Sequence, residues 1–282
     1  MLDSAINSSG DHSRTKHRPA TNIMGYPLFK FAPIRWMFRP SAHMQLEHLG
    51  GSKAATRKPQ IPDYLEDHYW WAYLRPASVK VFDHNPIVSA ILWGCYGRLK
   101  RAAFVELKAG QKVLQAACVY GDFSPHLANL VGTDGRLDII DIAALQVANC
   151  RRKLREFPHA QVRVADAAKP GSGVHNVVLC FFLLHELPDN YKRDVIDALL
   201  KRAGPDGKVV FIDYHRPHHL HPLRPIMSFV FDCLEPFAKT LWRREISSYA
   251  PAADKFTWRK ETYFGGLYQK VLAERGVQSD NF

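Results

Sequence analysis

The chain has 282 residues, of which 46% are hydrophobic and 23% are charged, enough to bury the core of one full domain. It contains no apolar run of the roughly 18 residues that a membrane-spanning helix needs, and its five cysteines form no CxxC pair. Buried reduced thiols in a reducing compartment are therefore favoured over a disulfide or zinc framework. The formal charge of +11 favours anionic partners, and without a recognisable nucleic-acid module we expect a membrane surface rather than nucleic acid.

Residues 1–58 carry nine Lys or Arg against three Asp or Glu, a surplus of six positive charges. The stretch YPLFKFAPIRWMF interleaves aromatic and aliphatic residues with cations, which favours contact with an anionic membrane, and a disordered solubilising tail is the alternative. The first 20 residues are poor in acids, so a mitochondrial presequence is a second reading, weakened by Asp3 and Asp11. We interpret 1–58 as a basic, weakly ordered tail.

Residues 59–109 are rich in aromatic side chains and predict a helical extension. Asp63 is placed to cap a helix that carries Leu65, Tyr69 and Tyr73 along one side. A second amphipathic helix is expected over residues 85–107, either on the core or on a bilayer. The stretch YWWAYL has three readings: an anchor at a bilayer interface, a cover for an active site, or simple packing.

From residue 110 onward the chain alternates between strand and helix patterns. Apolar strands are expected at 112–118, 135–142, 160–167, 175–187 and 207–215. Helices are expected at 122–132, with Ser124 as N-cap, at 143–157, and at 190–204, closed by Gly204. This order predicts an α/β, doubly wound, mostly parallel sheet with right-handed crossovers.

The C-terminal part completes the predicted sheet. Residues 216–257 are rich in Pro, His and aromatics and predict an amphipathic lid, whose apolar residues are typical of helix core. The stretch FTWRKETYFGGLYQKVLAER then predicts two strands joined by Gly265–Gly266, an antiparallel hairpin at the sheet edge. The sheet should therefore have seven strands, in one domain spanning 110–282.

Polar residues stand where the predicted strands end, and in such sheets ligands bind beyond the carboxyl ends of the strands. Asp141 is placed to accept both hydroxyls of a ribose, and Asp166 to receive an adenine amino group. Gly121 would let the backbone approach the ligand. Together these residues predict an adenosine cofactor.

The order of these motifs resembles that of class I S-adenosylmethionine-dependent methyltransferases over residues 110–282. LLHELPD, GPDGKVVFIDYH and TYFGGLYQKV are similar to the ubiquinone and menaquinone methyltransferases. YWWAYL, ILWGCYGRL, QAACVYGD, FFLLHE, DYHRPHHLHPLRP and TYFGGLYQKV together resemble the rhodoquinone-biosynthesis family over residues 61–272. That resemblance implies replacement of a ubiquinone methoxy group by an amino group, with S-adenosylmethionine as amino donor and Mn²⁺ required.

The first loop departs from the ordinary methyltransferase pattern [DE]-x-G-x-G-x-G. The corresponding positions hold Gln115, Ala117, Val119 and Gly121. If Val119 needed a positive φ, the strain would be about 1–2 kcal/mol. We expect these changes to shift the methionyl end of the cofactor, while Asp141 and Asp166 hold its adenosine.

Several strand-end side chains suit a metal ion. Asp213 and His215 share a face of one strand, and a mixed carboxylate–imidazole set suits Mn²⁺ better than thiolates would. The alternative is that these are ordinary loop residues and that His215 only caps a strand. The candidate metal ligands are Asp122, His185, Glu186, Asp213 and His215.

The candidate catalytic residues are Tyr120, Asp122, Asp213 and His215. Tyr120, Tyr214 and Tyr263 are candidates for stacking on a quinone ring, and the lid is where a prenyl tail would enter. The resulting hypothesis is a peripheral enzyme acting on ubiquinone at the cytoplasmic face of an inner membrane, or at the mitochondrial matrix face. The alternatives are a conventional quinone methyltransferase and a catalytically silent quinone-binding protein.

Overall fold

The structure is a computed structural model that describes residues 61–69, 73 and 75–275. The chain divides into two compact units, residues 1–50 and 51–282, and every described residue belongs to the second. The tail predicted for 1–58, Trp70 and Trp71 of YWWAYL, and residues 276–282 lie outside the described residues.

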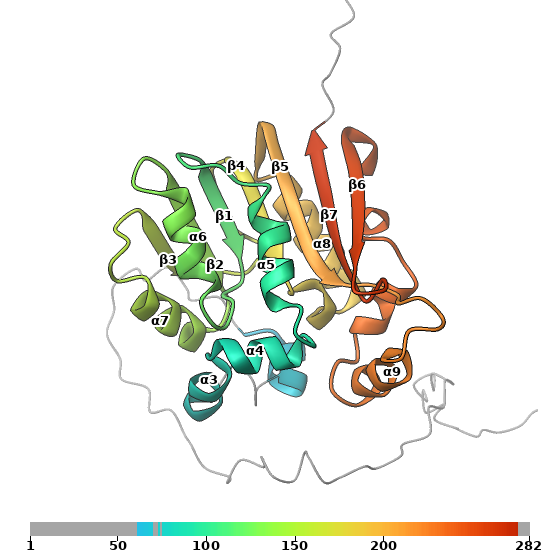
Figure 1. Ribbon diagram of the computed structural model, residues 1–282. Helices are drawn as coiled ribbons and strands as arrows, with labels where there is room; N and C mark the ends of the chain where they lie inside the picture. Colours follow the sequence, from blue (N-terminus) through green and yellow to red (C-terminus); the bar gives the residue numbers. More distant parts are fainter. Residues whose placement is uncertain (1–60, 70–72, 74, 276–282) are drawn as a thin grey trace, which may run out of the picture. The chain divides into compact units, whose positions relative to one another are not determined.

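The second unit is built on a seven-stranded sheet with the order β3-β2-β1-β4-β5-β7-β6 (Figure 1). Strands β1 to β5 run parallel to one another, whereas β7 pairs antiparallel with both β5 and β6. The prediction of a mostly parallel sheet with an antiparallel C-terminal hairpin is therefore confirmed. The strands span Lys112–Ala116 (β1), Arg136–Asp141 (β2), Ala160–Val164 (β3), His175–Phe181 (β4), Ala203–Tyr214 (β5), Phe256–Tyr263 (β6) and Tyr268–Arg275 (β7).

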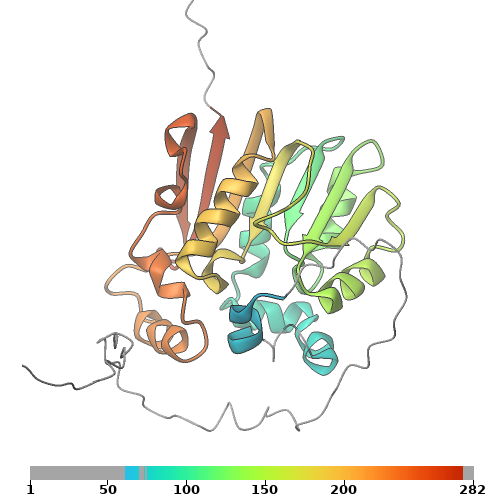
Figure 2. The ribbon, with the colours of Figure 1, turned by 180° about the vertical axis from the view of Figure 1, so that it is seen from behind.

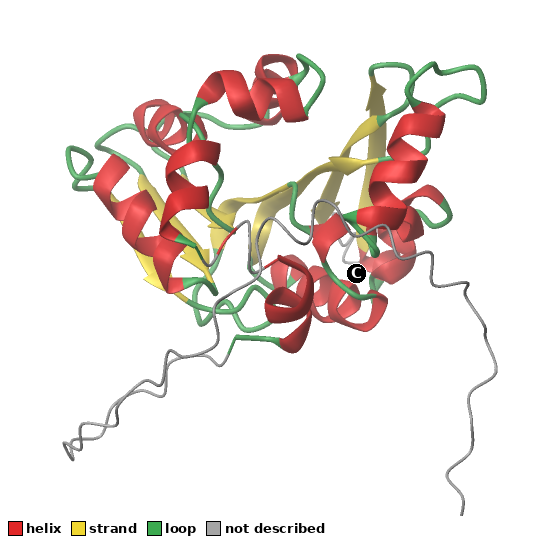
Figure 3. Cartoon of the chain, turned by 90° about the horizontal axis from the view of Figure 1, so that it is seen from below, coloured by secondary structure: helices red, strands yellow, loops and turns green. Residues whose placement is uncertain are grey.

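Helices cover both faces of the sheet (Figures 2 and 3). One face packs against α5 (Tyr96–Phe104), α6 (Phe123–Val131) and α7 (Ala144–Lys153), and the other against α8 (Asp189–Leu200). Successive strand residues point to opposite faces, so Val113 of β1 joins the first core and Leu114 the second. Strand order reverses between β1 and β4, which places a binding crevice beyond their carboxyl ends.

Two local expectations were wrong. Ser124 does not cap α6: Asp122 is the N-cap residue, and the Ser124 hydroxyl is buried against the side chain of Gln115. Gly204 does not close α8, which ends at Leu200, because Gly204 already belongs to β5. In each case a tertiary or sheet hydrogen bond overrides the local helix signal.

The predicted strand 175–187 is also shorter than expected. β4 ends at Phe181, because Phe182 has a φ of 53° and donates its N–H to the Ile212 carbonyl at 2.8 Å. The chain then turns into the short helix η2 (Leu184–Glu186). The turn places His185 and Glu186 at the carboxyl end of β4 rather than within the sheet.

The helical extension comprises η1 (Leu65–Tyr69), α3 (Pro76–Phe82) and α4 (Asn85–Ile91), followed by α5. The single helix predicted over 85–107 is broken, because Trp93 and Gly94 adopt φ values of 51° and 77°. The break lets α4 lie beyond the carboxyl ends of the parallel strands while α5 packs along the sheet (Figure 1).

The predicted lid contains α9 (Arg224–Cys233), η3 (Ala238–Trp242), η4 (Ile246–Tyr249) and η5 (Ala253–Lys255). Of these, α9 lies beyond the same end of the sheet as α4 (Figure 1), whereas η5 leads into β6 at the opposite end. Met227, Phe231 and Leu241 are core residues, as predicted, whereas Phe229 is exposed. Within the described part of the chain, no helix has the length and apolar character to cross a membrane.

Candidate active site

The loop after β1 forms the floor of the crevice, and its strained residue is not the one expected. Ala117 has a φ of 76° and Gly121 a φ of 74°, whereas Val119 does not adopt a positive φ. The conditional strain at Val119 therefore does not arise. The left-handed conformation instead costs Ala117 about 1–2 kcal/mol, because its Cβ crowds the backbone.

The loop is held in place by contacts with the helical extension and with α7. Asp83 accepts a hydrogen bond from the Gly121 N–H at 2.9 Å and from Lys153 Nζ at 2.7 Å. Lys153 Nζ also donates to the Gly121 carbonyl at 2.8 Å. A Cβ on Gly121 would lie 2.5 Å from Asn85 Oδ1, so this glycine permits close contact with α4.

Gln115 stands where methyltransferases carry an acid, but its side chain is fully buried. Its Nε2 donates to the Ala117 carbonyl at 2.8 Å and to Ser124 Oγ at 3.0 Å. Gln115 thus supports the strained loop from beneath. It does not line the cofactor pocket, and neither do Val119 and Gly121.

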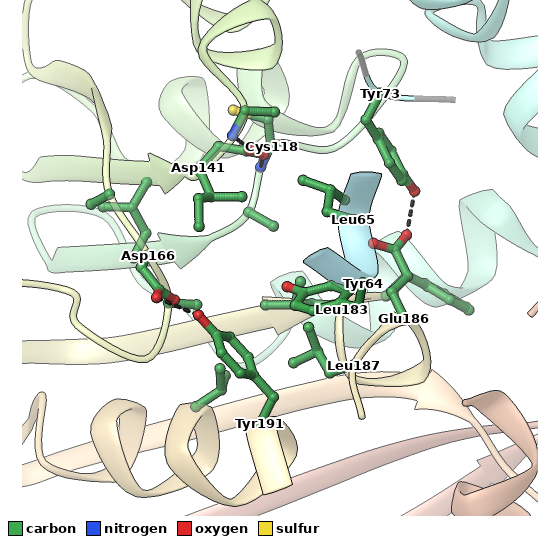
Figure 4. A pocket seen from close by; sticks show the side chains of 18 residues that line it. Tyr64, Leu65, Tyr73, Cys118, Asp141, Asp166, Leu183, Glu186, Leu187 and Tyr191 are labelled. Carbon is green, nitrogen blue, oxygen red and sulfur yellow. Dashed lines mark hydrogen bonds between the residues drawn. The ribbon is translucent and has the colours of Figure 1, made fainter. Parts of the chain in front are cut away.

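The cofactor pocket lies at the ends of β1, β2 and β3 and has a volume of about 70 Å³ (Figure 4). Of the predicted cofactor residues, Ala117, Asp141 and Asp166 line it. The other lining side chains include Tyr64, Leu65, Tyr73, Cys118, Glu186 and Tyr191. Sites for small molecules usually occupy roughly 300–1,000 Å³. Binding of a whole nucleoside cofactor therefore requires Tyr64 and Leu65, which project into the pocket, to shift.

Asp141 anchors the pocket at the end of β2. Its two oxygens accept the N–H groups of Cys118 and Ala143, each at 2.8 Å. Burial raises the pKa of Asp141 to about 6, although these hydrogen bonds oppose the shift. A buried carboxylate with free lone pairs at a strand end suits the ribose hydroxyls of an adenosine.

Asp166 follows β3, the strand beside β2, and lies on the same side of the pocket as Asp141 (Figure 4). It accepts the Ala168 N–H at 2.8 Å and the hydroxyl of Tyr191. Tyr64 packs on Tyr191 with ring centroids 5.3 Å apart. These two tyrosines were not predicted, and they give the Asp166 end of the pocket an aromatic wall.

A second pocket of about 180 Å³ adjoins the cofactor pocket and is mostly apolar. Its aromatic and aliphatic lining comprises Tyr69, Tyr73, Phe82, Val88, Ile91, Leu92, Val119, Tyr120, Phe181, Phe182 and Tyr214. Tyr73 and Tyr120 stack at 5.8 Å with an interplanar angle of 10°. Tyr73, Cys118, Phe182 and Glu186 line both pockets, so the two spaces share one wall.

Buried ionisable groups cluster behind that wall. His185 Nδ1 donates to Asp213 Oδ1 at 3.0 Å, and Glu186 lies 3.9 Å from His185 Nε2. Burial alone would lower the pKa of His185, but the Asp213 carboxylate outweighs it and raises the pKa to about 9. Burial raises the pKa of Glu186 to about 8, so this carboxyl is protonated at neutral pH.

Two tyrosines of the extension bind the carboxyls of this cluster. The Tyr73 hydroxyl donates to Glu186, and the Tyr69 hydroxyl donates to Glu235 Oε2 at 2.7 Å. Glu235 follows α9, lines the second pocket, and has a raised pKa because it is buried. Glu235 was missed by sequence reasoning, because the stretch FDCLEPF also holds the exposed Asp232 and nothing local distinguishes the two acids.

Three of the five predicted metal ligands, His185, Glu186 and Asp213, come together, whereas Asp122 and His215 do not join them. No three side chains of His, Cys, Asp or Glu are arranged to hold a metal ion within residues 61–69, 73 and 75–275. Both Asp213 oxygens are taken by hydrogen bonds, Oδ1 from His185 Nδ1 and Oδ2 from the Leu184 N–H. The described residues therefore do not fit the Mn²⁺ site predicted from the sequence.

Two predicted catalytic residues lie away from both pockets. Asp122 accepts hydrogen bonds from Lys100, Tyr96 and Asn85. Burial would raise the pKa of Asp122, but these hydrogen bonds, above all the one from the Lys100 ammonium, outweigh burial and lower the pKa to about 2. His215 Nδ1 contacts the Gly266 carbonyl at 2.8 Å. Neither side chain lines the cofactor or the aromatic pocket.

The other two predicted catalytic residues are at the aromatic pocket. Tyr120 lines it, and Asp213 lies behind His185, which lines it. Of the two further stacking candidates, Tyr214 lines the pocket, whereas the Tyr263 hydroxyl donates to Glu261 on the exposed hairpin.

The comparisons with known proteins all find methyltransferases. Residues 113–216 match the model of a methyltransferase domain. The chain is 25% identical over 171 residues to a 2-phytyl-1,4-naphtoquinone methyltransferase of Nostoc sp., covering 55% of this chain and 69% of that protein. It is 28% identical over 149 residues to a ubiquinone/menaquinone biosynthesis C-methyltransferase of Coxiella burnetii, covering 50% of this chain and 58% of that protein.

Solved structures share the fold at low sequence identity. The N-methyltransferase NodS of Bradyrhizobium japonicum, in complex with S-adenosylhomocysteine, matches with a TM-score of 0.51 and 14% identity over 75% of this chain and 96% of that chain. An O-methyltransferase family protein of Burkholderia thailandensis matches with a TM-score of 0.54 and 12% identity, covering 73% and 62%. With its sheet order, the chain has the fold of class I S-adenosylmethionine-dependent methyltransferases, and its residues 113–216 match the model of a methyltransferase domain.

Proposed function

We propose that this chain converts ubiquinone to rhodoquinone, replacing a ring methoxy group by an amino group that S-adenosylmethionine donates. The amine would displace the methoxy group as methanol, and the quinone ring would then oxidise the N–Cα bond to an imine and become the quinol. Water would hydrolyse the imine and release the aminoquinol and the 2-oxo acid of the donor. The observation that carries the proposal is the wall shared by the cofactor pocket and the aromatic pocket. A group-transfer enzyme needs donor and acceptor to meet across a few ångströms, and two adjoining pockets supply that proximity.

The donor would be held by its adenosine. Asp141 would accept the ribose hydroxyls, and Asp166 with Tyr64 and Tyr191 would bind the adenine. The methionyl end would then point toward Tyr73, Cys118 and Glu186. Because Gln115 is turned away into the core, no charge from that position holds the methionyl end as in ordinary methyltransferases.

The acceptor would lie in the aromatic pocket. Its flat, apolar lining suits a quinone ring, which can stack on the paired rings of Tyr73 and Tyr120. Ile91 is half exposed and lines the pocket, so a prenyl tail has an apolar route outward.

The buried polar cluster supplies proton donors at that ring. The imidazolium of His185, oriented by Asp213, and the protonated Glu186 could stabilise negative charge that develops on a quinone oxygen during attack. No step is assigned to Mn²⁺, because the described residues do not form a site for it.

A double-label experiment tests the proposal. The purified protein is incubated with ubiquinone and S-adenosylmethionine that carries ¹⁵N in its amino group and ¹³C in its methyl group, with and without Mn²⁺. We expect ¹⁵N in the quinone product. If only ¹³C entered the quinone, the reaction would be a methylation instead. If neither label entered the quinone, a quinone-binding protein would be favoured.

Conventional quinone methylation is the second candidate, because the curated relatives are named as quinone methyltransferases. The chain spans only 58–69% of the length of these relatives, so their activity is not carried over as a whole. For either reaction, the proposed place of action is the surface of an inner membrane, on its cytoplasmic or matrix side.

A further inference from the structure

Helix α9 exposes apolar side chains on one side. Ile226, Phe229 and Cys233 are three and four residues apart, so they form a single stripe, which we call the α9 stripe. Phe229 is 62% exposed and Ile226 46%, and Leu220 in the preceding loop is 76% exposed. The opposite side of α9 is anchored in the core by Met227 and Phe231. The exposed stripe is thus held rigidly toward solvent.

The α9 stripe adjoins a second exposed apolar element. The Trp93 indole, 40% exposed, donates its Nε1–H to Met227 Sδ at 3.2 Å, which ties the turn after α4 to α9. Ile91 is 50% exposed and lines the aromatic pocket. Both helices lie beyond the same end of the sheet (Figure 1). The exposed apolar side chains therefore lie near the entrance of that pocket.

A basic pocket of about 440 Å³ lies at the start of the lid. Its lining includes the arginines Arg216, Arg224, Arg243 and Arg244 and the histidines His215, His218 and His219. Arg216, Arg224 and Arg243 form no ion pair with any carboxylate of residues 61–69, 73 or 75–275, whereas Glu245, the acid in the lining, pairs with Lys260 at 2.7 Å. The uncompensated arginines create a positive field that favours an anion.

We propose that the α9 stripe and the basic pocket together form a docking surface for a bilayer that contains anionic phospholipids. The arginines would bind the headgroup phosphates, while Phe229, Ile226 and Leu220 insert among the upper acyl chains. The two halves share α9, which carries both the stripe and Arg224 of the basic pocket. Apolar side chains and arginines on one segment match the layered chemistry of a lipid surface. A nucleic acid would complement the charge and leave the apolar stripe in water.

This inference rests on the proposed function in one respect: a prenylated quinone resides in a membrane, and the docked surface would bring the aromatic pocket to it. The two ideas fail separately. Vesicle binding needs neither quinone nor S-adenosylmethionine, and label transfer to a short-chain quinone in solution needs no membrane.

Flotation of the full chain with lipid vesicles tests the docking surface. We expect binding to vesicles of phosphatidylcholine mixed with phosphatidylglycerol, and at least tenfold weaker binding to phosphatidylcholine alone. The triple variant Arg216→Gln, Arg224→Gln, Arg243→Gln should bind anionic vesicles roughly a hundredfold more weakly, because each arginine near the surface contributes about fivefold. Ile226→Ser with Phe229→Ser should weaken binding at least tenfold.

Matched controls come from elsewhere on the chain. Val105 and Val174 are 72% and 53% exposed, and Val174 precedes β4 at the opposite end of the sheet, so Val105→Ser with Val174→Ser should bind as the unaltered chain does. Arg136→Gln, Arg155→Gln, Arg259→Gln removes the same charge from other exposed sites and should weaken binding less than fivefold. The variant in which lysine replaces Arg216, Arg224 and Arg243 should keep most of the binding to anionic vesicles.

Three results would overturn the docking surface: equal binding to neutral and anionic vesicles, equal losses in the matched controls, or binding of a single-stranded oligonucleotide in place of vesicles. Because the altered residues are exposed, the variants should unfold within a few degrees of the unaltered chain, which thermal melts verify.

Discussion

The backbone of Ala117 shows how one residue can be kept in an unfavourable conformation. Its φ of 76° is normal for glycine and costly for alanine. The conformation persists because Gln115 binds the Ala117 carbonyl and the Ala117 N–H donates to the Ile140 carbonyl at 2.9 Å. Strain held in this way at a pocket wall is typical of functional loops.

Ala117→Gly should raise the free energy of unfolding by about 0.5–1 kcal/mol. The change removes about 1–2 kcal/mol of strain and adds a smaller entropy to the unfolded chain. Urea titrations measure the difference. Ala116→Gly is the control, because Ala116 is a buried residue of β1 without a positive φ and should lose stability. Equal losses in both variants would contradict strain at Ala117.

Asp141→Asn should weaken binding of S-adenosylhomocysteine about 10–100-fold, because hydrogen bonds to a charged acceptor are stronger than those to an amide. Titration calorimetry measures the affinity. Asp138→Asn on the same strand is the control, since Asp138 pairs with Arg136 outside the pocket and should bind normally. Unchanged affinity in Asp141→Asn would mean that the adenosine site lies elsewhere.

The pH dependence of the same residue gives a second test. The pKa of Asp141 is about 6 in the fold and 3.8 ordinarily, so the folded chain holds an extra proton between these values. This group's contribution to stability therefore falls as the pH rises from about 4 to 6. Affinity for S-adenosylhomocysteine should show the opposite trend and rise from pH 5 to pH 7, as the carboxylate forms. Asp141→Asn should show no such rise.

At the scale of elements, a buried lysine joins α8 to the lid. Lys192 Nζ is fully buried and donates to the carbonyls of Leu187 and Phe237, at 2.6 and 3.0 Å, and to Thr240 Oγ1 at 2.7 Å. The same ammonium lies 3.4 Å from Asp189 Oδ1. One side chain thus fixes η2, α8 and η3 relative to one another, and with them Glu186 and Glu235.

Lys192→Met should lower the free energy of unfolding by about 2–4 kcal/mol, because buried carbonyls lose their donor. Urea titrations of the variant measure the loss. Lys201→Met at the other end of α8 is the matched control, because Lys201 is exposed and, among the described residues, its ion pair is with Asp197. This variant should change the free energy of unfolding by less than about 0.5 kcal/mol. Similar effects in both variants would exclude a joining role for Lys192.

At the scale of the whole molecule, cofactor binding and folding are coupled. A ligand that binds only the folded state at 100 times its Kd adds about 2.7 kcal/mol of stability. For a chain of this size, S-adenosylhomocysteine should therefore raise Tm by about 5–10 °C. Homocysteine at the same concentration should not, because it lacks the adenosine that Asp141 and Asp166 are proposed to bind. Equal shifts would contradict the adenosine site.

Much of the fold was predictable from the sequence because it depends on local patterns. Apolar strands alternating with amphipathic helices determine a doubly wound sheet, and the paired Gly265–Gly266 determines the C-terminal hairpin. Strand-end acids also follow from chain order, since parallel strands end at one edge. Asp141 and Asp166 were found in this way, and both line the cofactor pocket.

What remained hidden depends on contacts between segments far apart in the chain. Nothing local to Asp122 indicates that Lys100 and Tyr96 will bind it, and nothing local to Tyr73 indicates that its hydroxyl will reach Glu186, 113 residues away. The sequence by itself determined the sheet, the likeness to methyltransferases and the acids at the strand ends. Only the tertiary structure decided which polar side chains meet, because ion pairs and pocket walls form between elements that packing, rather than sequence order, brings together.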